Sequence, residues 1–175
     1  EVQNVKVSGD IIASGVVRNH FNLQNGPAGD KGDIQQSFFM TQTRVRVDAD
    51  LTDNVSATVR LINERVWNGQ NDTATSGNSN IDLDLAYVTL KEFLYSPLTL
   101  TVGRQEIRFG NGLVIGNAGA LSSQTTIPVD LSERKAFDAI RATLNYDPLV
   151  MDVIYAKVYE GDTWRNNNMD LMGVN

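Results

Sequence analysis

Cysteine is absent from the 175 residues of this chain, and histidine occurs once, at His20. Without thiols the chain has no disulfide framework, no thiolate zinc site and no cysteine nucleophile of its own. With one imidazole it can build neither a histidine triad nor a two-histidine metal site within itself. We therefore expect no enzymatic activity, no catalytic residue, no metal site and no cofactor.

Long apolar runs are also absent, because no stretch of about 18 consecutive apolar residues occurs anywhere in the chain. This excludes transmembrane helices. Transmembrane strands remain compatible with the sequence, because each strand needs only about 9 to 11 residues and is apolar at alternate positions.

Positive charge is scarce as well, since 15 Lys and Arg stand against 21 Asp and Glu, which gives a net charge of -6. Binding to nucleic acid depends on many cations that neutralise phosphates on one face of the protein. These cations are few and dispersed, so we expect no nucleic-acid partner.

Alternation of apolar and polar residues is the feature that the sequence has in abundance. Val45 and Val47, for example, alternate with Arg44, Arg46 and Asp48. Period-two alternation places the two sets on opposite faces of a strand. The pattern predicts seven strands and the beginning of an eighth, at residues 5–18, 39–51, 55–64, 81–94, 98–109, 136–146, 149–159 and 169–174.

The connections between these strands alternate in length. Long polar connections at 25–36, 68–80 and 110–134 take turns with tight turns near residues 53, 96 and 147. Soluble sandwiches have no reason to separate loop lengths in this way, whereas outer-membrane barrels combine short periplasmic turns with long external loops. The fold predicted is all-β, an antiparallel up-and-down transmembrane β-barrel, with tight turns inside and long loops outside.

Residues 1–175 are interpreted as one domain, the N-terminal part of a single outer-membrane barrel. A barrel must close to satisfy its edge hydrogen bonds in lipid, and single-chain bacterial barrels have even strand counts. About seven to eight strands with a partial last one indicate a fragment of a larger barrel.

Two segments give a more specific indication, VGRQEIRFGNGLVIG at residues 102–116 and RKAFDAIR at residues 134–141. They resemble the alginate-export-type outer-membrane porin family. In that family a G-R-Q-E-hydrophobic-R-aromatic-G strand runs into a long loop, and the next strand opens with an R-x-x-F-D-hydrophobic-R-like pattern. The resemblance implies a barrel of about 16 to 18 strands in the bacterial outer membrane.

Charged residues on such strands must face the water-filled lumen, because an arginine at the bilayer midplane costs about 2 to 4 kcal/mol. Two interpretations of these charges stay open. The arginines could bind anionic groups weakly at successive points, or the charges could only pair with one another across strands. The residues predicted to line the pore are Arg44, Arg46, Arg60, Glu64, Arg104, Glu106, Arg108 and Arg141.

The function predicted is an outer-membrane porin-like channel that passes small anionic or sugar-like solutes through an arginine-lined lumen. One alternative is a non-conducting envelope barrel that serves as a structural anchor or surface scaffold. A second is a soluble all-β binding module, in which Val45, Val47, Val59 and Leu61 would face a packed core. The expected partners are outer-membrane lipid and the solute, and a homo-oligomer or another envelope partner is left open.

Overall fold

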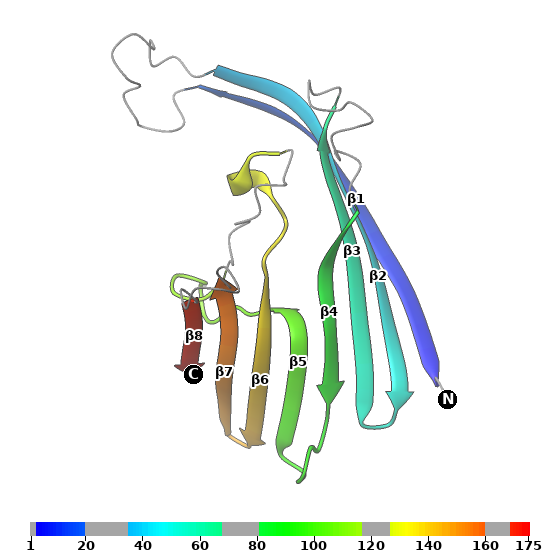
Figure 1. Ribbon diagram of the computed structural model, residues 1–175, viewed down its shortest axis with the longest axis vertical. Coiled ribbons are helices and arrows are strands. Elements are labelled where there is room, and N and C mark those ends of the chain that lie inside the picture. The colour runs from blue at the N-terminus through cyan, green and yellow to red at the C-terminus, as the bar shows by residue number, and fades with distance from the viewer. Residues whose placement is uncertain (1–2, 20–34, 68–80, 117–126, 160–168) are drawn as a thin grey trace, which may run out of the picture.

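The computed structural model describes residues 3–19, 35–67, 81–116, 127–159 and 169–175. Eight antiparallel strands form one sheet, and each strand pairs with the next one along the chain (Figure 1). Within these ranges no helix is long and apolar enough to cross a membrane. The strands are β1 (Asn4–Asn19), β2 (Gln35–Thr52), β3 (Val55–Val66), β4 (Asp82–Leu90), β5 (Leu98–Glu106), β6 (Ala136–Tyr146), β7 (Leu149–Tyr159) and β8 (Met169–Val174), with the short 3-10 helix η1 (Val129–Leu131) before β6.

This arrangement confirms the predicted all-β, antiparallel, up-and-down sheet. The turns that join β2 to β3, β4 to β5 and β6 to β7 lie at one end of the sheet, and the strand ends that lead into the longer connections lie at the other (Figure 1). The sheet is not closed, because its order begins at β1 and ends at β8 within the described residues. The described part of the chain is therefore the wall of a β-barrel without its closure.

Two strands, β4 and β5, end earlier than predicted, and β2 begins earlier, at Gln35 instead of residue 39. β4 stops at Leu90 instead of residue 94, because Glu92 and Leu94 have φ values of 53° and 67°. A non-glycine residue in this left-handed region cannot continue a strand. β5 stops at Glu106 instead of residue 109, and the backbone turns at Gly110 and Gly112, whose φ values are 53° and 75°.

One face of the sheet, called the open face below, has a complete row of residues without charge that runs through all eight strands. Residues paired directly across neighbouring strands point to the same face, so a row of pairs follows one face through the sheet. Apolar side chains of this kind face lipid on the outside of a transmembrane barrel. One complete row of the open face reads Val5, Ala49, Ala57, Val88, Val102, Ile140, Tyr155 and Met172.

The opposite face, called the covered face, carries most of the charged side chains and is overlaid by two segments of the chain. Residues 107–116 pack over β6, β7 and β8, where Ile107, Phe137, Ala139, Ile154 and Ala156 form a buried cluster. Residues 127–135 lie over β1 to β4 through side-chain contacts described below. The covered face is thus polar over β1 to β4 and partly apolar over β6 to β8.

A second row of the open face changes character along its length. It is apolar on β1 to β4, at Val7, Val47, Val59 and Ala86, and charged on β5 to β8. Barrel strands are tilted by about 35 to 45°, so a row perpendicular to the strands climbs along the barrel axis. The row therefore leaves the apolar band toward the end that carries the long connections. Its charged members are Arg104, Asp138, Lys157 and Asp170.

Candidate functional site

The candidate site is the covered face, and its first group of charges centres on Arg44 of β2. The Arg44 guanidinium donates to Asp10 of β1 from Nε at 3.0 Å and from Nη2 at 2.9 Å. Nη1 of the same side chain reaches Glu133 at 3.4 Å. Arg44 thus joins the wall to the segment that precedes β6.

Arg46 forms the second group, two residues further along β2 on the same face. Its Nε and Nη2 donate to the two oxygens of Asp48 at 2.8 Å each, and Nη2 also lies 3.5 Å from the Tyr87 hydroxyl. The hydroxyl of Thr58 donates to Asp48 at 2.7 Å. The Arg46 side chain remains 37% exposed, so the pair faces open space.

Arg60 of β3 lies where the sheet splits. Pairing between β4 and β5 ends at Ala86 and Arg104, although β4 continues beside β3 and β5 continues beside β6. Arg60 donates from Nε to Asp84 of β4 at 2.5 Å, and from Nη2 to Glu106 of β5. It is 9% exposed, and loss of one partner of such a buried pair typically costs about 3 to 5 kcal/mol. Arg60 therefore fastens the two edges of the split together.

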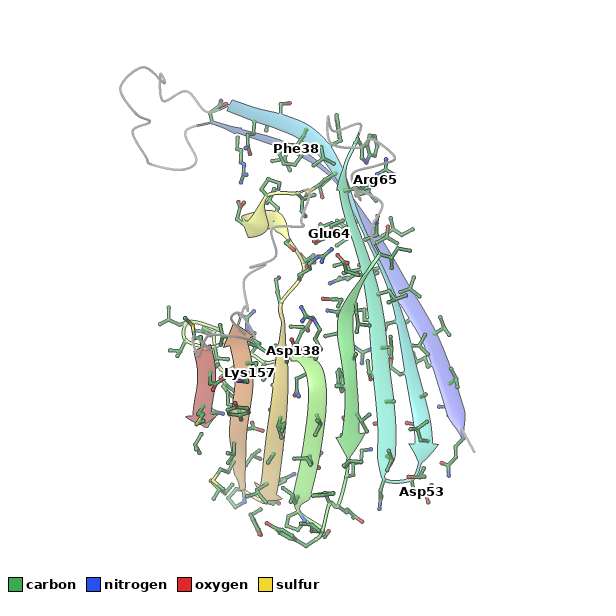
Figure 2. All side chains as sticks on the ribbon, in the orientation of Figure 1. Phe38, Asp53, Glu64, Arg65, Asp138 and Lys157 are labelled. Atoms are coloured by element: carbon green, nitrogen blue, oxygen red, sulfur yellow. The ribbon has the colours of Figure 1, made fainter. Side chains whose placement is uncertain are left out.

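Glu64, further along β3, is a buried carboxylate with several donors. It accepts from Gln42 Nε2 and Ser132 Oγ at 2.9 Å each, from the Glu133 backbone N–H at 2.8 Å and from Arg134 Nε at 3.1 Å. Three of these four donors belong to residues 127–135. Figure 2 shows Glu64 beside the segment that leads into β6.

Arg141 of β6 forms the last charged group of the covered face. Its Nε and Nη2 each donate to Asp152 of β7 at 2.8 Å, and the Thr143 hydroxyl donates to the same carboxylate at 2.6 Å. The guanidinium carbon lies 5.6 Å from the centre of the Phe109 ring. Phe109 is therefore a covered-face residue that orients a cation.

Arg104 corrects the expectation that the charges of residues 104–108 share one lumenal face. Arg104 pairs in register with Ala86 and Asp138, which places it on the open face, where its Nη1 donates to Asp138 at 3.1 Å. Asp138 and Lys157 lie near the ends of β6 and β7 that lead into the longer connections (Figure 2). The register of Arg104 with β4 and β6 determines which face of the sheet its side chain lies on, and its charge does not.

The other two residues of that motif also depart from a regular strand. Glu106 is the last residue of β5 and turns toward Arg60, so it meets the covered-face network across the split. Arg108 lies beyond β5 and donates from Nη2 to the Asn111 carbonyl oxygen at 3.0 Å. The structure thus brings Arg44, Arg46, Arg60, Glu64, Glu106 and Arg141 to the covered face or its edge, and it separates Arg104 from them.

Several residues of this face escaped the sequence-based prediction. Gln42 and Asp152 share the alternation of their strands, and that signal could have placed them. Asp82 lies beyond a register shift in the pairing of β3 and β4, so alternation alone could not have placed it. Ser132 and Arg134 lie in a connection, where no period exists. Their role depends on the folding of that segment onto the wall.

Aromatic residues mark both ends of the apolar open face. Phe39 and Trp67 stack with ring centres 5.5 Å apart near the long connections, and Trp67 Nε1 donates to the Thr41 hydroxyl at 2.6 Å. At the other end, a hydrogen bond with Tyr146 raises the pKa of the Tyr95 hydroxyl above its ordinary value. Aromatic girdles at both interfaces are typical of transmembrane barrels.

An antiparallel meander with one apolar face, one charged face and aromatic ends is the wall of an outer-membrane β-barrel. A family model described as alginate export matches residues 14–167 of the chain. The chain belongs to the alginate export family, a family of outer-membrane transport proteins that are channels rather than enzymes. A comparison with curated protein sequences gives no match.

Proposed function

We propose that this chain forms part of the wall of a channel that passes small anionic or sugar-like solutes across the bacterial outer membrane. The observation that carries the proposal is the row of arginine–carboxylate pairs on the covered face, opposite a continuous apolar face. A charged face opposite a lipid-compatible face is suited to a water-filled pathway.

The unused donors of the pairs support the choice of solute. Arg46 and Arg141 each hold their carboxylate through Nε and Nη2, and no hydrogen bond of either Nη1 occurs among the described residues. A guanidinium in this state presents a fixed donor to a passing carboxylate or hydroxyl group. Asp48, whose side chain is 33% exposed, supplies acceptor oxygens for sugar hydroxyls beside Arg46, whereas Asp152 is buried beneath Arg141.

The residues in the proposed pathway have different parts. Arg46 and Arg141 present donors to the solute, whereas Arg44 joins the wall to residues 127–135. Arg60 and Glu106 hold the split between β4 and β5 together. Arg108 contacts the backbone of its own connection, and Arg104 belongs to the open face and stands outside the pathway.

A non-conducting envelope barrel is the second candidate, and one observation favours it. Residues 107–116 and 127–135 both overlie the covered face, and such segments also fill barrels that serve as anchors. The two candidates differ in whether ions cross the barrel.

The test is the current through the full-length protein in planar bilayers. We expect a steady single-channel conductance with a preference for anions in reversal-potential measurements. Arg46→Gln should lower that preference, because Asp48 would then face the pathway without its partner. The double variant Arg46→Gln with Asp48→Asn should restore it in part, since both charges of the pair are then removed.

Arg104→Gln is the matched control, because it removes the same charge from the open face. It should leave ion selectivity unchanged. If no current is measured, the non-conducting envelope barrel is the correct candidate. If the wild type and Arg46→Gln have equal ion selectivity, the arginines only form ion pairs with neighbouring carboxylates and do not select the solute.

A further inference from the structure

The segment 127–135 is held against the wall by many side-chain contacts. Its contacts run to four strands, through Arg18 of β1, Gln42 and Arg44 of β2, Glu64 of β3 and Asp82 of β4. Yet the segment continues directly into β6 at Ala136. It therefore crosses the covered face, with neighbouring strands about 4.8 Å apart, instead of leaving the sheet at its end.

Glu64 is the centre of this attachment. Its side chain is fully buried, on a face where water would otherwise solvate it. A buried carboxylate is costly unless charged and polar donors compensate it. Since Ser132, Glu133 and Arg134 supply most of that compensation, the carboxylate and the segment depend on each other.

Four further contacts extend the attachment on both sides of Glu64. Arg134 Nη1 lies 2.5 Å from Asp82, and Gln42 Nε2 donates to the Leu131 carbonyl oxygen at 2.9 Å. Arg18 Nη1 lies 2.5 Å from Asp130, and Arg44 reaches Glu133. Both ends of the segment are thus held, while the side chains of Asp130, Glu133 and Lys135 stay at least one third exposed.

We propose that residues 127–135 form a constriction segment of the channel, and that Glu64 is the positioning residue that latches it against the wall. The inference rests on the proposed function, because a constriction has meaning only in a conducting barrel. The segment narrows the pathway and places Asp130, Glu133 and Lys135 opposite the wall arginines. It thereby sets the largest solute that passes, and the latch keeps that limit constant.

The first experiment compares the full-length wild type with Glu64→Gln in planar bilayers and in liposome-swelling assays with neutral sugars of increasing size. The amide replaces one carboxylate oxygen with a donor. That donor faces either Gln42 and the Glu133 N–H or Ser132 and Arg134, all of which donate to Glu64, so the latch should open. We expect about twofold higher conductance with larger current fluctuations, and entry of larger sugars than the wild type admits.

Asp152→Asn is the matched control. Asp152 is also a buried carboxylate of the covered face, but its partners are Arg141 and Thr143 and it does not contact the segment. It should leave the sugar size limit unchanged. An equal increase in both variants would show that loss of any wall carboxylate widens the channel, and would overturn the latch.

A second variant remains informative if Glu64→Gln does not fold. The chain contains no cysteine, so Glu64→Cys with Ser132→Cys introduces a single pair at the latch. Glu64 reaches Ser132 through the end of its side chain, so a short bifunctional thiol reagent is used instead of a direct disulfide. Conductance should be raised before cross-linking and fall to the wild-type value after it.

The outcomes separate the two proposals. A wild type without current would refute the proposed function. A conducting wild type whose sugar size limit is unaffected by Glu64→Gln and by cross-linking would refute the constriction segment alone.

Discussion

Gly103 occupies a position in β5 where a side chain has neither the space nor the backbone conformation that it needs. Its φ is 121°, and a Cβ atom there would lie 2.2 Å from the Ala86 carbonyl oxygen and 2.9 Å from the Tyr87 Cα. Both atoms belong to the backbone of β4, so neither can move without shifting the strand. Only glycine fits at this point, directly below the split between β4 and β5.

Gly103→Ala should therefore destabilise the protein. Backbone strain alone costs about 1 to 3 kcal/mol, and the steric overlap adds to it. Urea unfolding in lipid vesicles measures the loss. Gly110→Ala is the matched control, because Gly110 also has a positive φ, 53°, but has open space where its Cβ would lie. The smaller loss of stability expected for Gly110→Ala should separate the cost of backbone strain from the cost of steric overlap. Equal losses of stability in the two variants would contradict the role assigned to the Ala86 oxygen.

Single residues also show where sequence reasoning succeeds and where it fails. Arg44, Arg46 and Arg141 follow the alternation of long strands, and the register places them together on the covered face. Arg104 follows the alternation of β5 equally well, but its register partners put it on the open face. Alternation defines two faces, and charge alone does not identify which of them a given residue occupies near a strand end.

At the scale of the strands, the two faces of β1 offer a direct test of the membrane assignment. Val7 belongs to the open face, where it is 68% exposed, and the adjacent Ser8 belongs to the covered face beside Arg46. Val7→Arg should cost about 2 to 4 kcal/mol if it lies near the bilayer midplane, and less toward the interface.

Ser8→Arg is the control for that substitution, because it places the same side chain one residue away on the covered face. It should cost much less in unfolding experiments in lipid vesicles. The soluble binding module differs in another way, because there the face of Val7 and Val47 would pack against a core and the protein would stay in solution without detergent. Equal stability of the two variants would contradict the assignment of the open face to lipid.

The strands themselves were predictable because their alternation is local. Strand positions and antiparallel neighbours follow from period two and short turns, and both agree with the structure. The end of β4 was not predictable in the same way. Glu92 and Leu94 adopt left-handed backbone conformations, but neither is a glycine or an asparagine, the residues from which such a conformation is usually predicted.

At the scale of the whole molecule, the orientation of the barrel remains a prediction that labelling on intact cells can test. Asp53 lies in the tight turn between β2 and β3, and Leu113, which is 94% exposed, lies in the long connection after β5. The two residues therefore mark opposite ends of the strands. With short turns in the periplasm and long loops outside, a membrane-impermeant maleimide should label Leu113→Cys but not Asp53→Cys.

Cells with a permeabilised outer membrane provide the control, since both variants should then react. Figure 2 shows Asp53 at the end of the sheet opposite to the long connections. Labelling of Asp53→Cys on intact cells, without labelling of Leu113→Cys, would reverse the orientation. The proposed pathway would remain, because it does not depend on which end faces the cell.

The sequence by itself determined the strands, their order and the existence of a polar and an apolar face, because each of these follows from contacts between residues close along the chain. Only the tertiary structure decided that residues 127–135 lie across the covered face with Glu64 beneath them, and that Arg104 lies on the other side. Glu64 and Ser132 are far apart in sequence and share no period. Their contact depends on strand register, on tilt and on the burial of one carboxylate, and these arise only when the whole sheet has formed.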